Sequence, residues 1–177
     1  TDAICDDLFI TEHSGLINLA KEGVADEKVH FVGNVMIDSL VYFREKANAL
    51  HLSEVTANQI NNGQNNNLNA KEYILMTMHR PHNVDYEKGL KDIITIIQNA
   101  AKKKTVVFAI HPRTSNNLKK FGLYEELEGI KNLILLPPQG YLQFLKLMDN
   151  AALIITDSGG IQEETTYLQV PCMTFRD

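Results

Sequence analysis

The sequence predicts an α/β domain built on a doubly wound parallel sheet, and two observations lead to this fold class. Several short segments are continuous runs of apolar residues, without the alternation that is typical of a half-exposed strand. Over residues 73–175, segments with apolar residues at helical spacing separate these runs. Fully apolar strands that alternate with helices are typical of a parallel sheet covered by helices on both faces.

The first part of the chain contains two short apolar segments and two helical ones. In chain order, we expect strands over 6–11 and 29–34 and helices over 15–22 and 35–50. Ser14 is expected to cap the first helix and Gly23 to end it. The next segment, 56–72, is polar and rich in asparagine. It has too little apolar content to pack, so we expect an exposed, mobile loop there.

Beyond this loop the alternation of strands and helices becomes regular. The expected strands cover 73–79, 105–112, 132–138, 152–156 and 171–175. The expected helices between them cover 85–103, 116–122, 141–151 and 161–169. In such a fold, ligands bind beyond the carboxyl ends of the strands.

Composition excludes several classes of protein. The chain has 177 residues, of which 44% are apolar, and a formal net charge of −5. Because there is no basic stripe, we expect no nucleic-acid partner. No apolar run approaches the ~20 residues that a membrane-spanning helix needs, so we expect no membrane partner. Cys5 and Cys172 fit no metal-ligand spacing, and we expect buried thiols, no metal and a cytoplasmic location.

The ends of the sequence indicate a piece of a longer protein. The chain begins at Thr1, close to an expected strand, and it ends at "TFRD" without a closing helix. We therefore expect that the natural protein continues beyond these residues.

Polar and cationic residues follow the expected strands of the regular part. The residues at these positions are His79, Arg80, His111, Arg113, Gln139, Tyr141, Asp157, Ser158, Gly159 and Gly160. Because the carboxyl ends of parallel strands share one edge of a sheet, we expect these residues to converge on a ligand.

The stretch "TDSGGIQEE", residues 156–164, has the chemistry of an anion site. Gly159 and Gly160 lack Cβ, so the backbone can turn tightly and approach a ligand closely. The helix that follows presents unpaired N–H groups and the positive end of its dipole, which suit a phosphate. Ser158 adds a hydroxyl donor, and Glu164, about one turn further on, can accept hydrogen bonds from a ribose. The plainer alternative is that Ser158 is only an N-cap.

The other candidates also have structural alternatives. His79 can be a structural histidine, and we expect His82 and His111 to be structural. Arg80 and Arg113 are either surface charges or phosphate ligands, for which the guanidinium fork is suited. Asp157 is expected to brace the turn, and the Glu163–Glu164 pair can be a solvated helix face.

Four motifs together resemble those of the non-hydrolysing UDP-N-acetylglucosamine 2-epimerases. They are "HFVGNVMIDSL", "ILMTMHRPHNVD", "LPPQGYLQFLKLM" and "ITDSGGIQEE…PCMTFRD". The resemblance covers nearly the whole chain except the asparagine-rich loop. It implies two Rossmann-like domains in the glycosyltransferase-B arrangement with the active site between them. Residues 1–34 would then end the first domain, and 35–177 would be the UDP-binding second domain, truncated at its end.

The resemblance also implies a role for individual residues. Ser158, Gly159 and Gly160 would bind the diphosphate of UDP, and Glu164 would hold the ribose. Gln139 and Phe144 would contact the uridine, Phe144 through its backbone. His79 would lie near the diphosphate and take part in catalysis. No cofactor is implied. In this chain His82 stands where many relatives have a glutamate.

The reaction implied is inversion at C2 of the sugar, by elimination of UDP to a glycal and re-addition to the other face. The carboxylates that move the C2 proton would come from the first domain. The resemblance further implies a homodimer and a role in cell-surface polysaccharide biosynthesis. Two alternatives stay open: an epimerase for a related UDP-amino sugar or of the hydrolysing type, and a nucleotide-binding module without catalysis of its own.

Overall fold

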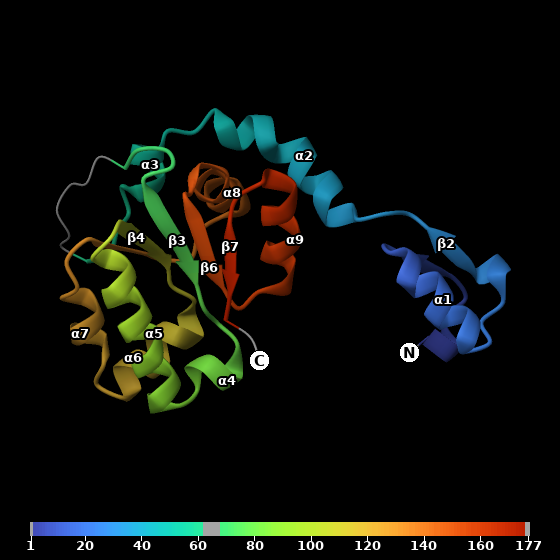
Figure 1. The fold of residues 1–177 in the computed structure, drawn as a ribbon, viewed down its shortest axis with the longest axis horizontal. Helices are drawn as coiled ribbons and strands as arrows, with labels where there is room; N and C mark the ends of the chain where they lie inside the picture. Colours follow the sequence, from blue (N-terminus) through green and yellow to red (C-terminus); the bar gives the residue numbers. More distant parts are fainter. Residues whose placement is uncertain (1, 62–67, 176–177) are drawn as a thin grey trace. The chain divides into compact units, whose positions relative to one another are not determined.

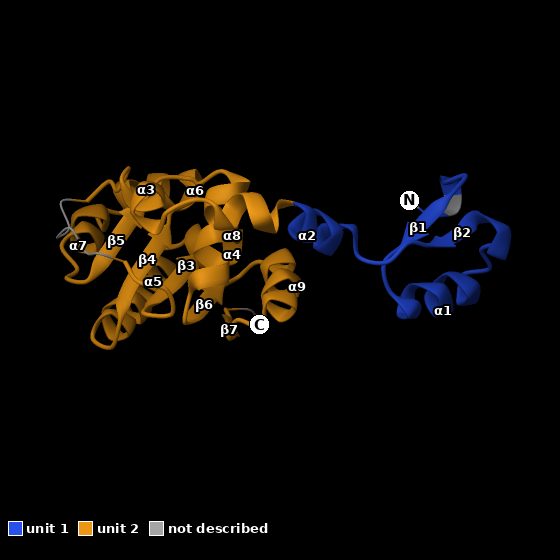
Figure 2. Cartoon of the chain, turned by 90° about the horizontal axis from the view of Figure 1, so that it is seen from above, with its two compact units in different colours: residues 1–42 blue, residues 43–177 orange. Residues whose placement is uncertain are grey.

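The structure is a computed structural model that describes residues 2–61 and 68–175. The chain divides into two compact units, residues 1–42 and 43–177 (Figure 2). The division falls inside helix α2 (Val35–Asn48).

The first unit is a small βαβ motif. Strands β1 (Leu8–Ile10) and β2 (Val29–Phe31) pair in parallel, and α1 (His13–Lys21) connects them. Short 3-10 turns cover Asp2–Ile4 and Asp26–Lys28. The predicted cap at Ser14 is wrong, because α1 begins two residues before the predicted helix and Glu12 is its N-cap. The Ser14 hydroxyl donates instead to the Glu12 carboxylate, at 3.3 Å.

The second unit is built on a five-stranded parallel sheet with the order β5-β4-β3-β6-β7. Its strands are β3 (Tyr73–Thr77), β4 (Thr105–Ala109), β5 (Leu133–Leu136), β6 (Leu153–Thr156) and β7 (Cys172–Thr174). Each of them was predicted, and the prediction of a doubly wound parallel sheet is confirmed. The apolar runs explain this success, since the central strands β4, β3 and β6 are largely buried on both faces.

Helices cover both faces of this sheet (Figure 1). On one face lie α5 (Glu87–Ala101), α6 (Pro112–Lys120) and α7 (Tyr124–Glu128), whose apolar side chains share one core with every second strand residue. That core includes Ile74 and Met76 of β3. The other face carries α3 (Leu52–Thr56), α8 (Tyr141–Asn150) and α9 (Gly159–Leu168). On that side the Tyr73 hydroxyl donates to the Leu147 carbonyl of α8, at 2.6 Å.

Three short helices were not predicted: α3, α7 and α4 (Pro81–Val84). Each has only one turn, so no apolar periodicity reveals it in the sequence. Pro81 nevertheless starts α4 at its first position, where a missing N–H costs no hydrogen bond. Pro112 does the same for α6, which therefore begins four residues before the predicted helix.

Most described residues of the asparagine-rich segment are exposed, as expected, but Asn61 is buried against the sheet. The Asn61 side chain is 6% exposed and binds edge strand β5 at both amide atoms. Its Nδ2 donates to the Leu133 carbonyl at 2.7 Å, and its Oδ1 accepts from the Leu135 amide at 2.9 Å. Asparagine can pack here because its amide carries the same donor and acceptor as a strand residue. The remainder of the predicted loop, 62–67, lies outside the described residues.

Replacing Gly89 by alanine is expected to destabilise the protein. A Cβ at this position of α5 would lie 2.2 Å from the Asn83 carbonyl oxygen of α4, so one of the two helices has to move. Such overpacking typically costs about 1–3 kcal/mol, more than the higher helix propensity of alanine gains. Thermal unfolding measures the effect. Gly129→Ala is the control, because its Cβ would meet nothing closer than 3.4 Å. Equal melting temperatures for the two variants would contradict the prediction.

Candidate functional site

The candidate site lies where the order of strands reverses. The chain passes from β3 to β4 and β5 on one side, then returns to place β6 and β7 on the other side of β3. The ends of β3 and β6 are therefore neighbours, with Thr77 opposite Thr156. The segments beyond them lead to helices on opposite faces of the sheet, α5 and α9, and in α/β folds ligands bind in the crevice at such a point. His79 and Arg80 follow β3, and Asp157 and Ser158 follow β6.

Asp157 is the buried centre of this crevice. Its carboxylate is 0% exposed and accepts hydrogen bonds from the amides of His79, at 3.0 Å, and Arg80, at 2.7 Å. The Nδ2 of Asn83 donates to the same carboxylate at 3.1 Å. A buried carboxylate needs such donors, because it has lost its hydration. Asp157 thus ties the loop after β3 to the turn after β6, in the bracing position expected from the sequence.

His79 lies half-exposed above this carboxylate. Its Nδ1 is 3.0 Å from Asp157 Oδ1, and 41% of its side chain is exposed. Its ring centroid is 5.7 Å from that of His111, which follows β4. One nitrogen of His79 is therefore held inside the protein, while the ring remains accessible to a ligand.

The turn after β6 presents free backbone donors. Ser158 is the N-cap of α9, but its side chain makes no capping hydrogen bond. The amides of Gly159, Gly160 and Ile161 have no acceptor within the helix, since they belong to its first turn. The first turn also carries no acidic residue. The N-terminus of α9 is thus uncapped and electropositive, as an anion site requires.

The two glycines work differently from the way the sequence suggested. Neither Gly159 nor Gly160 has a positive φ; both are the first residues of α9. A tight turn that only glycine can adopt is therefore not what requires them. Their remaining property is the missing Cβ, which leaves the amides of the first turn open to a ligand.

Glu164 lies one turn further along α9 and is paired with α8. The Tyr141 hydroxyl donates to its Oε1, at 3.2 Å. Burial raises the pKa of Glu164 and the nearby Glu163 raises it further, whereas the hydrogen bond from Tyr141 lowers it. Burial, together with the Glu164 carboxylate, raises the pKa of Tyr141 to about 12. The pair offers a carboxylate with an acceptor oxygen left for a ligand.

Gln139 lies on the segment that connects β5 with α8, and Phe144 lies in the first turn of α8. The Gln139 side chain is folded back, with Nε2 donating to the Pro137 carbonyl at 2.8 Å. The Phe144 amide already donates to the Gly140 carbonyl within α8, at 2.9 Å. The expected backbone contact of Phe144 therefore cannot use its N–H, and only its carbonyl or ring remains.

The two candidate arginines differ in their surroundings. Arg113 forms a bidentate ion pair with Asp85, which lowers the pKa of that carboxyl. Its fork is therefore occupied within the protein. The Arg80 guanidinium forms no hydrogen bond or ion pair with residues 2–61 or 68–175, so it is free for a ligand. His111 is structural, because its Nδ1 accepts from the Arg113 amide at the start of α6.

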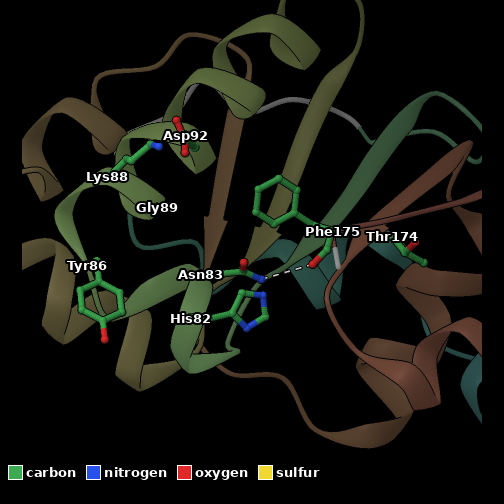
Figure 3. Close-up of a pocket in the computed structure, with 8 residues that line it drawn as sticks. All are labelled: His82, Asn83, Tyr86, Lys88, Gly89, Asp92, Thr174 and Phe175. Atoms are coloured by element: carbon green, nitrogen blue, oxygen red, sulfur yellow. Dashed lines mark hydrogen bonds between the residues drawn. The ribbon is translucent and has the colours of Figure 1, made fainter. Parts of the chain in front are cut away.

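A separate pocket of about 650 Å³ lies beside the crevice, between α4, the start of α5 and the end of β7. Asn83 and His82 line it, together with Tyr86, Lys88 and Phe175 (Figure 3). None of Ser158, Gly159 and Gly160 contributes to its wall. Sequence reasoning did not single out Asn83 as a site residue, and it considered Tyr141 only by its position after a strand.

Within residues 2–61 and 68–175, no group of three or more His, Cys, Asp or Glu residues could hold a metal ion. No helix there is long and apolar enough to cross a membrane. Neither Cys5 nor Cys172 forms a disulfide bond with the described residues, and both are partly exposed, which corrects the expectation of buried thiols.

Comparison with known proteins gives a consistent result. A family model described as UDP-N-acetylglucosamine 2-epimerase matches residues 1–177. A protein of that name from Methanococcus maripaludis is 40% identical over 184 residues, covering 100% of this chain and 47% of the relative.

Two solved structures are similar throughout the chain. The Methanocaldococcus jannaschii UDP-GlcNAc 2-epimerase in complex with UDP-GlcNAc and UDP has a TM-score of 0.82 and 36% identity, and the match covers 99% of this chain and 47% of that one. The Neisseria meningitidis UDP-GlcNAc 2-epimerase bound to UDP-GlcNAc has a TM-score of 0.78 and 28% identity, over 100% and 46% of the two chains. The chain therefore spans about half the length of these relatives.

Proposed function

Because the chain belongs to the UDP-N-acetylglucosamine 2-epimerase family, we propose that it is the UDP-binding half of an enzyme that interconverts UDP-GlcNAc and UDP-ManNAc. The observation that carries the proposal is the crevice between β3 and β6. There the uncapped N-terminus of α9 and the half-exposed His79 lie on neighbouring strand ends. The Rossmann-like fold of glycosyltransferase-B type, which the chain shares with its structural neighbours, provides that crevice.

UDP would bind with its diphosphate at the start of α9. The amides of Gly159 and Gly160 and the Ser158 hydroxyl would donate to its oxygens, and Arg80 would supply a free positive charge. Glu164 would accept hydrogen bonds from the ribose hydroxyls, because its carboxylate is one turn beyond the phosphate. Gln139 and Phe144 would contact the uracil from the start of α8.

The chemistry assigned to this half is stabilisation of the leaving group. A base removes the proton from C2, the C1–O bond breaks, and its electron pair leaves with UDP while a C1–C2 double bond forms. Negative charge then grows on the diphosphate, where the amides of α9 and His79 would stabilise it. UDP then adds back to C1 and a proton to the other face of C2, which gives the epimer.

The base and the acid would come from outside this chain. Glu163 and Glu164 are adjacent on α9, so their side chains diverge by about 100°. Asp157 is fully buried beneath its donors. The described residues at this edge of the sheet thus offer no pair of carboxylates that could flank one carbon atom. We propose that the first domain, of which residues 1–34 would be the end, supplies them.

The finer properties of the whole protein follow the family resemblance. We propose a homodimer in the cytoplasm that supplies cell-surface polysaccharide biosynthesis. Sedimentation of the full-length protein at several concentrations tests the dimer, and a single monomeric species would contradict it.

Deuterium exchange tests the proposed reaction. The full-length protein, incubated with UDP-GlcNAc in deuterated water, should form UDP-ManNAc and carry deuterium at C2 of both sugars. The 177-residue chain should bind UDP and leave C2 unlabelled. Deuterium introduced by the 177-residue chain would reveal a base within it. A full-length protein that labels only another UDP-amino sugar would support that alternative substrate.

UDP binding should weaken at mildly acidic pH because of Glu164. Burial raises its folded-state pKa, so the carboxylate takes up a proton above the usual pH range of a glutamate and becomes a poorer acceptor for ribose hydroxyls. Tyr141→Phe removes the hydrogen bond that lowers this pKa, so the loss should begin at higher pH. Glu164→Gln should remove this contribution to the pH dependence. Calorimetric titration of UDP between about pH 4.5 and 7.5 tests these three expectations. An identical pH dependence of UDP affinity in wild type and Tyr141→Phe would contradict them.

A further inference from the structure

We infer that Asp157 is a positioning residue for His79, which it holds in one tautomer with Nε2 directed to the ligand. This inference deepens the proposed function, because it assigns the residue that prepares His79 for its role at the diphosphate. Asp157 itself is fully buried and cannot touch a substrate.

The position of the Asp157 carboxylate is determined by donors other than the His79 ring. It accepts from three donors besides the His79 ring: the amides of His79 and Arg80, and Asn83 Nδ2. Two of these donors are backbone amides that share Oδ2, so the carboxylate cannot rotate away without leaving both of them unpaired. The position of Oδ1 beside the ring is therefore set by the fold.

Asn83 provides the second constraint on this carboxylate. Asn83 is 5% exposed, and its Nδ2 donates to Asp157 at 3.1 Å. The same Nδ2 donates to the Phe175 carbonyl at 3.3 Å (Figure 3). Phe175 in turn donates its amide to the Thr156 carbonyl of β6, at 2.8 Å. The amide of Asn83 therefore bridges α4, the turn after β6 and the residue after β7.

The tautomer of His79 follows from this arrangement. A carboxylate can only accept, so Nδ1 at 3.0 Å from Oδ1 must carry a hydrogen. Nε2 is then the only ring nitrogen left for the half-exposed side. A second proton on Nε2 would make the ring a cation with its charge balanced by Asp157, and such a group would stabilise a departing diphosphate. This is the logic by which a buried carboxylate orients a catalytic histidine in hydrolase triads.

The test compares full-length wild type with Asp157→Asn by ¹⁵N NMR of labelled histidines, with His79→Gln used to assign the signal. In wild type, His79 Nδ1 should carry a hydrogen. In Asp157→Asn, the carboxamide oxygen is expected to continue to accept hydrogen bonds from the two backbone amides, so the NH₂ group faces the imidazole. The Nδ1 of His79 should then lose its hydrogen and become an acceptor. The kcat for epimerisation should fall about 100-fold, with KM little changed.

Asp149→Asn is the matched control, because it also removes a largely buried carboxylate from an ion pair, with Arg44 at 3.0 Å. It should lower the melting temperature and leave both the His79 tautomer and kcat as in wild type. An unprotonated Nδ1 in wild type would overturn the inference even if Asp157→Asn fails to fold, as would an unchanged tautomer in the variant. The two proposals can also fail separately. If the full-length protein has no epimerase activity, the proposed reaction is refuted. If His79 Nδ1 nevertheless carries a hydrogen only when Asp157 is present, the positioning role is supported.

Discussion

Replacing His79 by alanine in the full-length protein is expected to lower kcat by about 10²–10³-fold, while the affinity for UDP changes far less. A group that stabilises departing UDP acts on negative charge that develops as the C1–O bond breaks and that the bound UDP-sugar does not yet carry. Its loss therefore appears chiefly in kcat rather than in the binding of UDP. Steady-state rates with UDP-GlcNAc and calorimetric titration with UDP measure the two effects separately.

His51→Ala is the control for this substitution. His51 is exposed and precedes α3, and it contributes nothing to the crevice. Its variant should keep the wild-type kcat. If His79 were purely structural, His79→Ala would instead lower the melting temperature and leave the rate of the folded enzyme nearly unchanged. Melting curves recorded beside the rates distinguish these results.

Replacing Gly159 by valine is expected to abolish UDP binding to the 177-residue chain, with a loss of about 100-fold or more. The branched side chain would occupy the space in front of the uncapped α9 amides, where the diphosphate is proposed to lie. Two charge-assisted hydrogen bonds would be lost, each worth about 1.5–3 kcal/mol. Valine at the first position of a helix costs only about 0.6 kcal/mol in propensity, so the chain should remain folded.

The matched control is Gly129→Val, which introduces the same side chain at an exposed glycine after α7. UDP titrated against wild type and both variants, by calorimetry or by NMR shifts, gives the comparison. Equal affinity of Gly159→Val and wild type would show that the phosphate does not bind at this turn.

The strands were predictable because a strand that is buried on both faces appears in the sequence as a continuous run of apolar residues. Leu133–Leu136, for example, are all buried, and their letters alone form an apolar run. The short helices were not predictable, because one turn shows no periodicity. Asn61 was missed for another reason: a polar side chain that pairs with a strand edge cannot be told from a solvated one by composition.

The site was predictable where one general rule applies. The rule that ligands bind at the carboxyl ends of strands selected His79, Asp157 and Ser158, and the structure places all three at one crevice. Asn83 could not be found in this way, because its role depends on Asp157, which is 74 residues away in the chain. The pairing of Arg113 with Asp85 likewise depends on which helices become neighbours, which no local pattern records.

The reversal of strand order also determines when the crevice can form as the chain folds. Strand β3 pairs with β4 across 32 residues, from Tyr73 to Thr105, but with β6 across 79 residues, from Ile74 to Leu153. Closing the longer loop costs about 0.8 kcal/mol more in chain entropy. During synthesis from the N-terminus, β3, β4 and β5 emerge from the ribosome and can associate before β6 exists. His79 has then been synthesised but Asp157 has not, so a half-sheet of β3, β4 and β5 would have an exposed β3 edge and no anion site. Nucleotide binding would report only on chains that have completed the second half of the sheet.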